Sequence, residues 1–205
     1  MSLLLVRHGE TSLNIARVLQ PAATPLSDKG HRQAAALAHR LASMGLGAIV
    51  SSDLPRALQT AQHLAQATDL PIIKTPLLQE RSFGDLRGHA YDRLEVDPIQ
   101  MIEAPPGGES MAAFEQRVAA AFAHLVDLRS AMQRPLVVVS HGLVISVLLR
   151  LHARQRANGP PLPVRLRNCS LSIVAAAAPF EIELLDCTAH LAGDLIEPPC
   201  SLSGG

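Results

Sequence analysis

Tryptophan is absent from this chain of 205 residues, and aromatic residues make up only 2% of it. Few aromatic rings leave few platforms on which single-stranded nucleic acid could stack and few anchors for a membrane interface. The chain also lacks an excess of either charge, because its 18 basic and 18 acidic side chains cancel. No overall field then attracts nucleic acid or anionic lipid. We therefore expect neither nucleic acid nor a membrane among its partners.

Cysteine and long hydrophobic runs are scarce as well. The cysteines, Cys169, Cys187 and Cys200, are odd in number and show no CxxC spacing, which argues against a disulfide framework and a structural zinc site. We expect reduced thiols, with Cys200 in a mobile tail. Charged residues or histidines interrupt every long apolar run before it could cross a bilayer, and the run at residues 3–6 is too short for the core of a signal peptide. The expected location is cytoplasmic.

The chain does contain an alternation of apolar, strand-like runs with stretches of helical period. The expected strands span residues 3–7, 48–51, 71–75 and 136–140, with two more at 170–177 and 180–187 that resemble an antiparallel edge. The expected helices span about residues 27–44, 53–68, 110–130 and 143–152. This pattern predicts an α/β fold, a three-layer α/β/α sandwich around a mostly parallel central sheet, in a single domain at residues 1–192.

Three segments are rich in glycine, proline or charge and are expected to be loops: residues 79–108, 157–163 and 193–205. The first is too long for an ordinary connection in a compact domain, and such loops usually form lids or binding segments. We expect a lid-like loop at about residues 79–108 and a flexible tail at residues 193–205.

Arg7 and His8 follow directly after the first expected strand, at the edge of an α/β sheet where ligands gather. An imidazole can attack phosphorus as a nucleophile, and a guanidinium can hold phosphate oxygens through its fixed fork of donors. Gly9 lets the chain turn sharply and approach a ligand closely. Alone, the pair is moderate evidence, because arginine and histidine at a strand end are frequently just a solvated terminus.

Two further strand ends repeat this arrangement. The second expected strand leads to Arg56, where Ser52 or Asp53 is the expected N-cap and the arginine adds its charge to an anion-binding helix N-terminus. The fourth strand leads to His141 and Gly142, just before another helix. Taken singly, each residue is more often structural, as a surface arginine paired with a carboxylate or as a packed histidine.

Together the three strand ends supply two arginines and two histidines at one edge of the sheet, while the carboxylates are scattered along the chain. A metal-dependent phosphatase needs several Asp, Glu or His ligands that converge. The pattern therefore predicts phosphoryl transfer by the protein itself, without a metal or another cofactor.

Several ordered motifs resemble the histidine phosphatase superfamily, also called the phosphoglycerate mutase-like family, over nearly the whole chain. They are a strand followed by Arg-His-Gly-Glu at residues 7–10, Pro-Leu-Ser-Asp-Lys-Gly at 25–30, the segment 51–61, Ser-His-Gly at 140–142, Asn-Cys-Ser at 168–170 and Thr-Ala-His-Leu at 188–191. The resemblance is to the phosphatase branch. It implies the phosphoglycerate mutase-like fold and a phosphohistidine intermediate formed from a small-molecule phosphate ester.

The resemblance also assigns the residues of the site. The catalytic residues are His8, Glu80, His141, Arg7 and Arg56. The phosphate-binding residues are Arg7, Asn14, Gln20, Arg56, His141 and Gly142. His8 is the nucleophile, and Glu80, at the start of the long loop, is the general acid that protonates the leaving alkoxide and then accepts a proton from water.

The chain departs from the family pattern at two positions. Pro21 follows Gln20 where the family often has glycine, which removes a backbone N–H and stiffens this wall. Many phosphatase members carry a tryptophan near the position of Leu86. Because this chain lacks it, the resemblance does not identify the non-phosphate half of the substrate. Of the other histidines, His89 alone could reach the pocket from the loop. No chemistry is assigned to His31, His39, His63, His124, His152 and His190.

Three functions stay open on the sequence: a phosphomonoesterase, a cofactor-dependent phosphoglycerate mutase and a non-catalytic phosphate-binding module. A degenerate binder is expected to lose His8 or Glu80, and both are present. A mutase needs a second anion site for the carboxylate of phosphoglycerate, whereas residues 89–109 carry one arginine against five carboxylates, a formal charge of −4. This favours the phosphatase, although Arg87 could offer part of a carboxylate clamp. The substrate stays open, and a homodimer is compatible with the sequence.

Overall fold

The central sheet of the computed structural model has six strands, within the described residues 2–155, 161–163, 165–175 and 177–196. The strands are β1 (Ser2–Arg7), β2 (Ala48–Ser52), β3 (Ile72–Thr75), β4 (Leu136–Ser140), β5 (Leu171–Ala175) and β6 (Ile182–Cys187). They follow the order β3-β2-β4-β1-β5-β6 across the sheet. The first four are parallel, whereas β5 runs antiparallel to both β1 and β6. The prediction of a mostly parallel sheet is confirmed.

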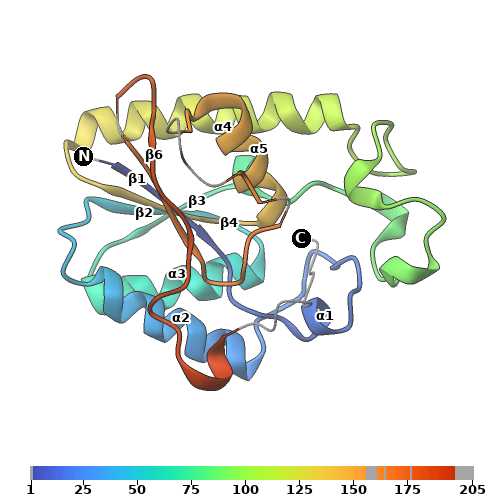
Figure 1. Ribbon diagram of the computed structural model, residues 1–205, viewed down its shortest axis with the longest axis horizontal. Helices are drawn as coiled ribbons and strands as arrows, with labels where there is room; N and C mark the ends of the chain where they lie inside the picture. Colours follow the sequence, from blue (N-terminus) through green and yellow to red (C-terminus); the bar gives the residue numbers. More distant parts are fainter. Residues whose placement is uncertain (1, 156–160, 164, 176, 197–205) are drawn as a thin grey trace.

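Helices cover both faces of this sheet and give the three layers seen in Figure 1. One face carries α2 (Asp28–Leu41) and α3 (Pro55–Thr68), and the other carries α4 (Met111–Met132) and α5 (Gly142–His152). Side chains alternate along β1, so that Leu3 and Leu5 pack with α4 and α5 while Leu4 and Val6 pack with α2 and α3. Because both faces are buried, the strand is apolar at every one of these positions.

The start of α3 differs from the expected capping. Pro55 occupies the first turn, where its missing N–H costs nothing. The N-cap, however, is Leu54 and not Ser52 or Asp53. The hydroxyl of Ser52 accepts the N–H of Leu54 at 3.3 Å, and this bond turns the chain from β2 into the helix.

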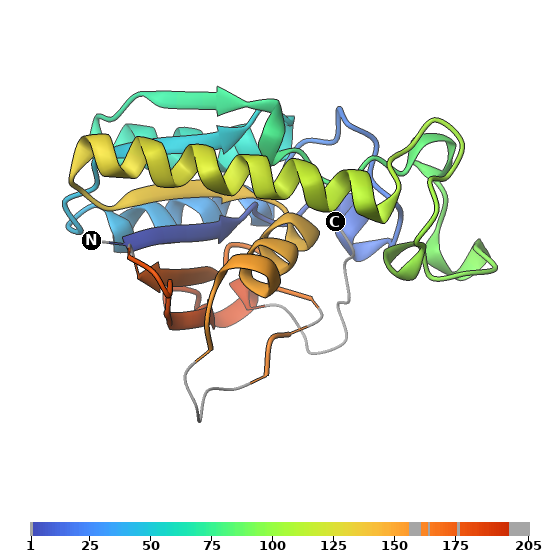
Figure 2. The ribbon, with the colours of Figure 1, turned by 90° about the horizontal axis from the view of Figure 1, so that it is seen from above.

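The segment between β3 and α4 contains short 3-10 turns instead of an open loop. The turns are η1 (Pro76–Leu78), η2 (Gly84–Leu86), η3 (Tyr91–Arg93) and η4 (Pro98–Gln100). Leu19 fastens this segment to the chain after β1, because its N–H donates to His89 O at 2.9 Å and its carbonyl accepts the N–H of Gly88 at 2.7 Å. We call residues 82–109 the insert. Figure 2 shows the insert, in green, beyond the carboxyl ends of the parallel strands.

Two further segments differ from the sequence prediction. A short helix, α1 (Ser12–Ile15), follows the first strand end. The expected tail begins with η5 (Gly193–Leu195), which packs against α2 through a hydrogen bond from Gln33 Nε2 to Leu195 O at 2.9 Å. Residues 197–205 of the expected tail and residues 157–160 of the expected loop lie outside the described residues.

In the part of the chain that the structure describes, no helix has the length and hydropathy that a bilayer span requires. Cys169 is buried, Cys187 is partly exposed, and both are reduced. Cys200 lies outside the described residues.

Close packing of two backbones makes Gly30, in the first turn of α2, a sensitive position. A Cβ there would lie 2.1 Å from the carbonyl oxygen of Glu10. Alanine is ordinarily about 1 kcal/mol better than glycine inside a helix, but this clash reverses the sign. We expect Gly30→Ala to lower the free energy of unfolding by about 2 kcal/mol, as overpacking does.

Denaturant unfolding measures this effect, with Gly142→Ala in the first turn of α5 as the matched control. A Cβ at Gly142 would meet no atom closer than 3.6 Å, so this variant should be at least as stable as the parent. A Gly30→Ala protein that is as stable as the parent would contradict the packing described above.

Candidate active site

His8 lies directly after β1 with its backbone held on both sides. Its N–H donates to Ser140 O at 3.0 Å, and its carbonyl accepts the side-chain amide of Asn168 at 2.9 Å. The ring Nδ1 lies 2.7 Å from Gly9 O. Because a carbonyl oxygen only accepts, Nδ1 carries the proton and the lone pair lies on Nε2. That Nε2 is buried and has no hydrogen-bond partner among the described residues.

The surroundings of His8 keep its ring neutral. Burial lowers the pKa of His8 well below its ordinary value, and the positive charges of Arg56 and Arg7 lower it further. The hydrogen bond to Gly9 O acts in the opposite direction but is the smallest of these effects. At neutral pH the lone pair on Nε2 is therefore available for attack on an electrophile.

His141 lies beside His8, with ring centroids 5.2 Å apart, at the N-cap position of α5. Its Nε2 lies 2.9 Å from Ser52 Oγ, and its buried Nδ1 has no partner in the described part of the chain. Burial lowers the pKa of His141 well below its ordinary value, and the charges of Arg56 and Arg7 lower it further. A neutral ring here can donate one hydrogen bond to an anion.

Two arginines supply the positive charge of the site. Arg7, the last residue of β1, is 1% exposed, and Arg56, in the first turn of α3, is 2% exposed. Burial lowers the pKa of Arg56 to about 10, against the opposing effect of the Glu80 carboxylate, so the guanidinium stays charged at neutral pH. Gly142 lies next to Arg7, because a Cβ at Gly142 would be 3.6 Å from Arg7 Nε. The N-terminus of α5 thus adjoins the arginine.

Asn14 and Gln20 add two amide groups. Asn14 Oδ1 accepts the N–H of Thr11 at 3.0 Å, and Gln20 Oε1 accepts the hydroxyl of the same threonine at 2.9 Å. With the oxygens used in this way, Nδ2 of Asn14 and Nε2 of Gln20 are buried donors that bond to none of the described residues. Buried donors ordinarily have an acceptor, so these two are suited to an anion.

The carboxylate of Glu80 lies at the N-terminus of α5. Its Oε2 accepts the N–H of Leu143 at 3.2 Å, and its Oε1 accepts the N–H of Arg81 at 3.0 Å. Burial raises the pKa of Glu80 above its ordinary value, although the two hydrogen bonds and the charges of Arg56 and Arg7 oppose the shift. A raised pKa keeps the carboxyl protonated to higher pH, as a general acid requires.

These contacts bring together, at the carboxyl edge of the sheet, every residue that the sequence assigned to the site: Arg7, His8, Asn14, Gln20, Arg56, Glu80, His141 and Gly142. The cluster combines a neutral imidazole with a free lone pair, two cations, several N–H donors and one carboxyl group. Chemically, it can bind a tetrahedral oxyanion and transfer its central atom to His8.

Gly9 permits a close contact within the fold that the sequence did not indicate. A Cβ at Gly9 would lie 2.6 Å from the carbonyl oxygen of Gly30, so the close approach that glycine permits here is between two backbones. The neighbouring Glu10 accepts the hydroxyl of Ser27 at 3.0 Å and lies 3.5 Å from Lys29 Nζ. This part of the motif fastens the nucleophile to the start of α2.

The sequence analysis missed three residues around the site. Ser52 bonds to His141, and Asn168 holds the nucleophile's backbone. Tyr91 of the insert is 9% exposed, and burial together with the Glu80 charge raises the pKa of its hydroxyl. Ser52 and Asn168 stood within motifs that the sequence analysis quoted, so closer attention to their polar groups could have found them. Tyr91 is the one tyrosine of the chain and lies in none of the motifs that indicate the site.

The sequence left open whether His89 and Arg87 contact the substrate, and these two residues differ in exposure. His89 is exposed, and its Nδ1 lies 3.2 Å from Leu86 O. Arg87 is half-buried, and its charge contributes to the lowered pKa of Arg56, so it lies near the phosphate-binding arginines. Within the described ranges, no group of three or more His, Cys, Asp or Glu side chains is arranged to hold a metal ion.

Known proteins share both the sequence and the fold of this chain. The family model of the histidine phosphatase superfamily (branch 1) matches residues 3–180. A curated relative from Yersinia enterocolitica, named "Probable phosphoglycerate mutase GpmB", is 37% identical over 213 residues, which cover 93% of this chain and 95% of the relative.

Two solved structures of phosphatases resemble the chain. A mycobacterial glucosyl-3-phosphoglycerate phosphatase in complex with inorganic phosphate is 28% identical, with a TM-score of 0.76 and coverage of 93% of this chain and 99% of that one. The alpha-ribazole phosphatase of Shigella flexneri is 27% identical, with a TM-score of 0.76 and coverage of 95% and 100%. The relatives thus carry one mutase name and two phosphatase names.

Proposed function

Because the chain belongs to the histidine phosphatase superfamily (branch 1), we propose that it is a metal-independent phosphomonoesterase that hydrolyses a small phosphorylated metabolite through a phosphohistidine on His8. The observation that carries the proposal is the state of His8. Its Nδ1–H bonds to Gly9 O at 2.7 Å, and its buried Nε2 lone pair lies beside two cationic arginines. A nucleophile next to an anion site is what phosphoryl transfer requires.

In the first step, the phosphate of the ester binds in the cluster. Its ligands are Arg7, Asn14, Gln20, Arg56, His141 and the N–H groups near Gly142. His8 Nε2 attacks phosphorus, the bond between phosphorus and the ester oxygen breaks, and Glu80 gives its proton to the leaving alkoxide. The bond from Nδ1–H to Gly9 O stabilises the positive charge that develops on the phosphorylated ring.

In the second step, water attacks the phosphorus while the Glu80 carboxylate accepts a proton from it. The bond between phosphorus and Nε2 breaks, inorganic phosphate leaves, and His8 returns to its neutral state. The arginines and the N–H donors stabilise the charge on the transferring phosphoryl group, as preorganised donors do in an oxyanion hole. The protein's own residues thus supply the field that a metal ion supplies in other phosphatases.

Phosphoglycerate mutase is the second candidate, favoured by the name of the Yersinia relative. The charge of residues 89–109, which belong to the insert, argues against it. Their formal charge is −4, and although Glu109 is paired with Arg117, the other four carboxylates against Arg93 still repel a second anionic group on the substrate. Arg81 does not supply a second anion site, because it is 1% exposed and donates to the backbone carbonyls of Glu109 and Glu103. A substrate whose other half is neutral or cationic fits this segment better than phosphoglycerate.

The phosphohistidine provides the first test of the proposed function. Protein quenched in alkaline denaturant, which preserves the acid-labile P–N bond, during turnover of a labelled phosphate ester in the presence of EDTA should carry the label on His8, as peptide mass spectrometry would locate it. The label should be missing in His8→Ala. Label on His141 would reverse the roles of the two histidines, and an unlabelled protein that only binds phosphate would mean a non-catalytic module.

The choice between phosphatase and mutase rests on relative rates. We expect phosphate release from at least one neutral-tailed monoester to be faster than the interconversion of 2- and 3-phosphoglycerate with bisphosphoglycerate as primer. The repulsion between the insert and the additional carboxylate of phosphoglycerate is the physical reason. Mutase turnover faster than phosphate release from every monoester in a broad panel would show that the second candidate is right.

A further inference from the structure

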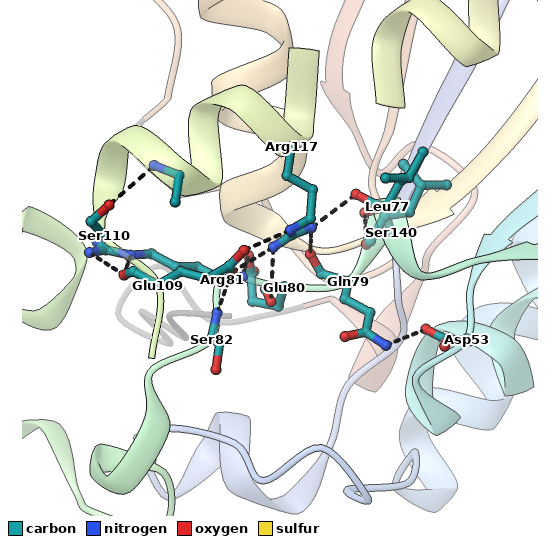
Figure 3. Close-up of polar contacts among 12 residues, drawn as sticks. Asp53, Leu77, Gln79, Glu80, Arg81, Ser82, Glu109, Ser110, Arg117 and Ser140 are labelled. Carbon is teal, nitrogen blue, oxygen red and sulfur yellow. Dashed lines mark hydrogen bonds and ion pairs between the residues drawn. The ribbon is translucent and has the colours of Figure 1, made fainter. Parts of the chain in front are cut away.

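Arg117, on α4, lies against the backbone that leads to Glu80 (Figure 3). Its Nη1 donates to Leu77 O at 2.9 Å and to Gln79 O at 2.7 Å, and its Nη2 lies 3.5 Å from Glu80 O. The carbonyl of Leu78 accepts the hydroxyl of the last residue of β4 at 2.8 Å. Side chains therefore hold the carbonyl oxygens of four consecutive residues, and three of the four are held by one guanidinium.

Glu109 forms the other half of this arrangement, which we call the Arg117 clamp: Arg117, Glu109 and residues 77–82. The carboxylate of Glu109 accepts Nε and Nη2 of Arg117, both at 2.8 Å, as a bidentate pair. All five N–H groups of the guanidinium thereby have an acceptor. Partial burial raises the pKa of Glu109, but hydrogen bonds from Arg117 and from Ser82 N–H outweigh it and hold the pKa below its ordinary value. Glu109 is thus charged at neutral pH.

The clamp also closes the insert at its base. Ser82 N–H donates to Glu109 Oε2 at 2.8 Å, and Glu109 N–H donates to Ser82 O at 2.8 Å. The guanidinium of Arg81 adds bonds to Glu109 O at 3.0 and 3.1 Å. The two ends of the insert therefore meet directly after Glu80, and Arg117 ties this junction to α4.

The place of the Glu80 carboxyl depends on this backbone. Two main-chain N–H groups bind its oxygens, and one of them, Arg81 N–H, belongs to the clamped segment itself. A misplacement of about 1 Å can cost a catalytic group about 100-fold in rate. We infer that Arg117, held by Glu109, is the positioning residue that sets Glu80 for proton transfer to the leaving group. This inference rests on the proposed phosphatase function.

The test compares a poor leaving group with a good one, because only the poor one needs the acid. We expect Arg117→Met to lower kcat/KM about 100-fold for an alkyl phosphate and less than about 5-fold for p-nitrophenyl phosphate. Arg117→Lys keeps the charge but lacks the planar fork, so it should recover part of the loss. Arg150→Met is the matched control, because Arg150 pairs with Glu115 at an exposed site and should change neither rate.

Equal losses on the two esters, or no loss on either, would overturn the positioning role of Arg117. If Arg117→Met does not fold, as thermal unfolding would reveal, Arg117→Lys is judged by the same criterion. Glu80→Gln, measured in parallel, separates this inference from the proposed function. If Glu80→Gln loses more activity on the alkyl phosphate than on p-nitrophenyl phosphate while the Arg117 variants lose equally on both, only the positioning role of the clamp is wrong. If Glu80→Gln itself loses equally on both esters, the assignment of Glu80 as the general acid is wrong.

Discussion

The hydrogen bond from His8 Nδ1–H to Gly9 O is the interaction on which the site depends. It selects one tautomer and leaves the lone pair on the buried Nε2. Burial and the charges of Arg56 and Arg7 then prevent protonation of that nitrogen, because they lower the pKa of the ring. The arginines that hold the phosphate in the proposed function therefore also keep the His8 ring neutral.

The fold supports this cluster by gathering like charges where an anion is to bind. Arg7 and Arg56 repel each other. Arg7 ends β1 and Arg56 follows the end of β2, and these two strands flank β4 in the parallel part of the sheet. The burial of two like charges costs free energy, and Glu80 offsets part of that cost for Arg56. In the proposed function, a bound phosphate would offset the rest of this cost. In the proposed mechanism, Glu80 must lie close to the bound ester without forming a full ion pair with Arg7 or Arg56. The Arg117 clamp holds the backbone on which the position of the Glu80 carboxyl depends.

The parts of the site that were predictable from the sequence are those set by local patterns. His8, His141 and Arg56 each follow an apolar strand, so their place at the sheet edge follows from strand length and topology. Glu80 and the two amides came from the family resemblance. Arg117 could not be found in this way, because it lies 37 residues from Glu80 in the chain, and neither could the bond between His141 and Ser52, which are 89 residues apart. The 3-10 turns of the insert and the contact of Gly9 with Gly30 also depend on tertiary packing that no local pattern reports.

The state of the His8 ring is the most direct test of this account, and ¹⁵N chemical shifts of the imidazole in labelled protein report it. We predict a neutral ring with the proton on Nδ1 at about pH 6, where a histidine with its ordinary pKa of about 6.5 is mostly protonated. The assignment is checked by loss of the signal in His8→Asn. An imidazolium at that pH, or a neutral ring with the proton on Nε2, would contradict the account.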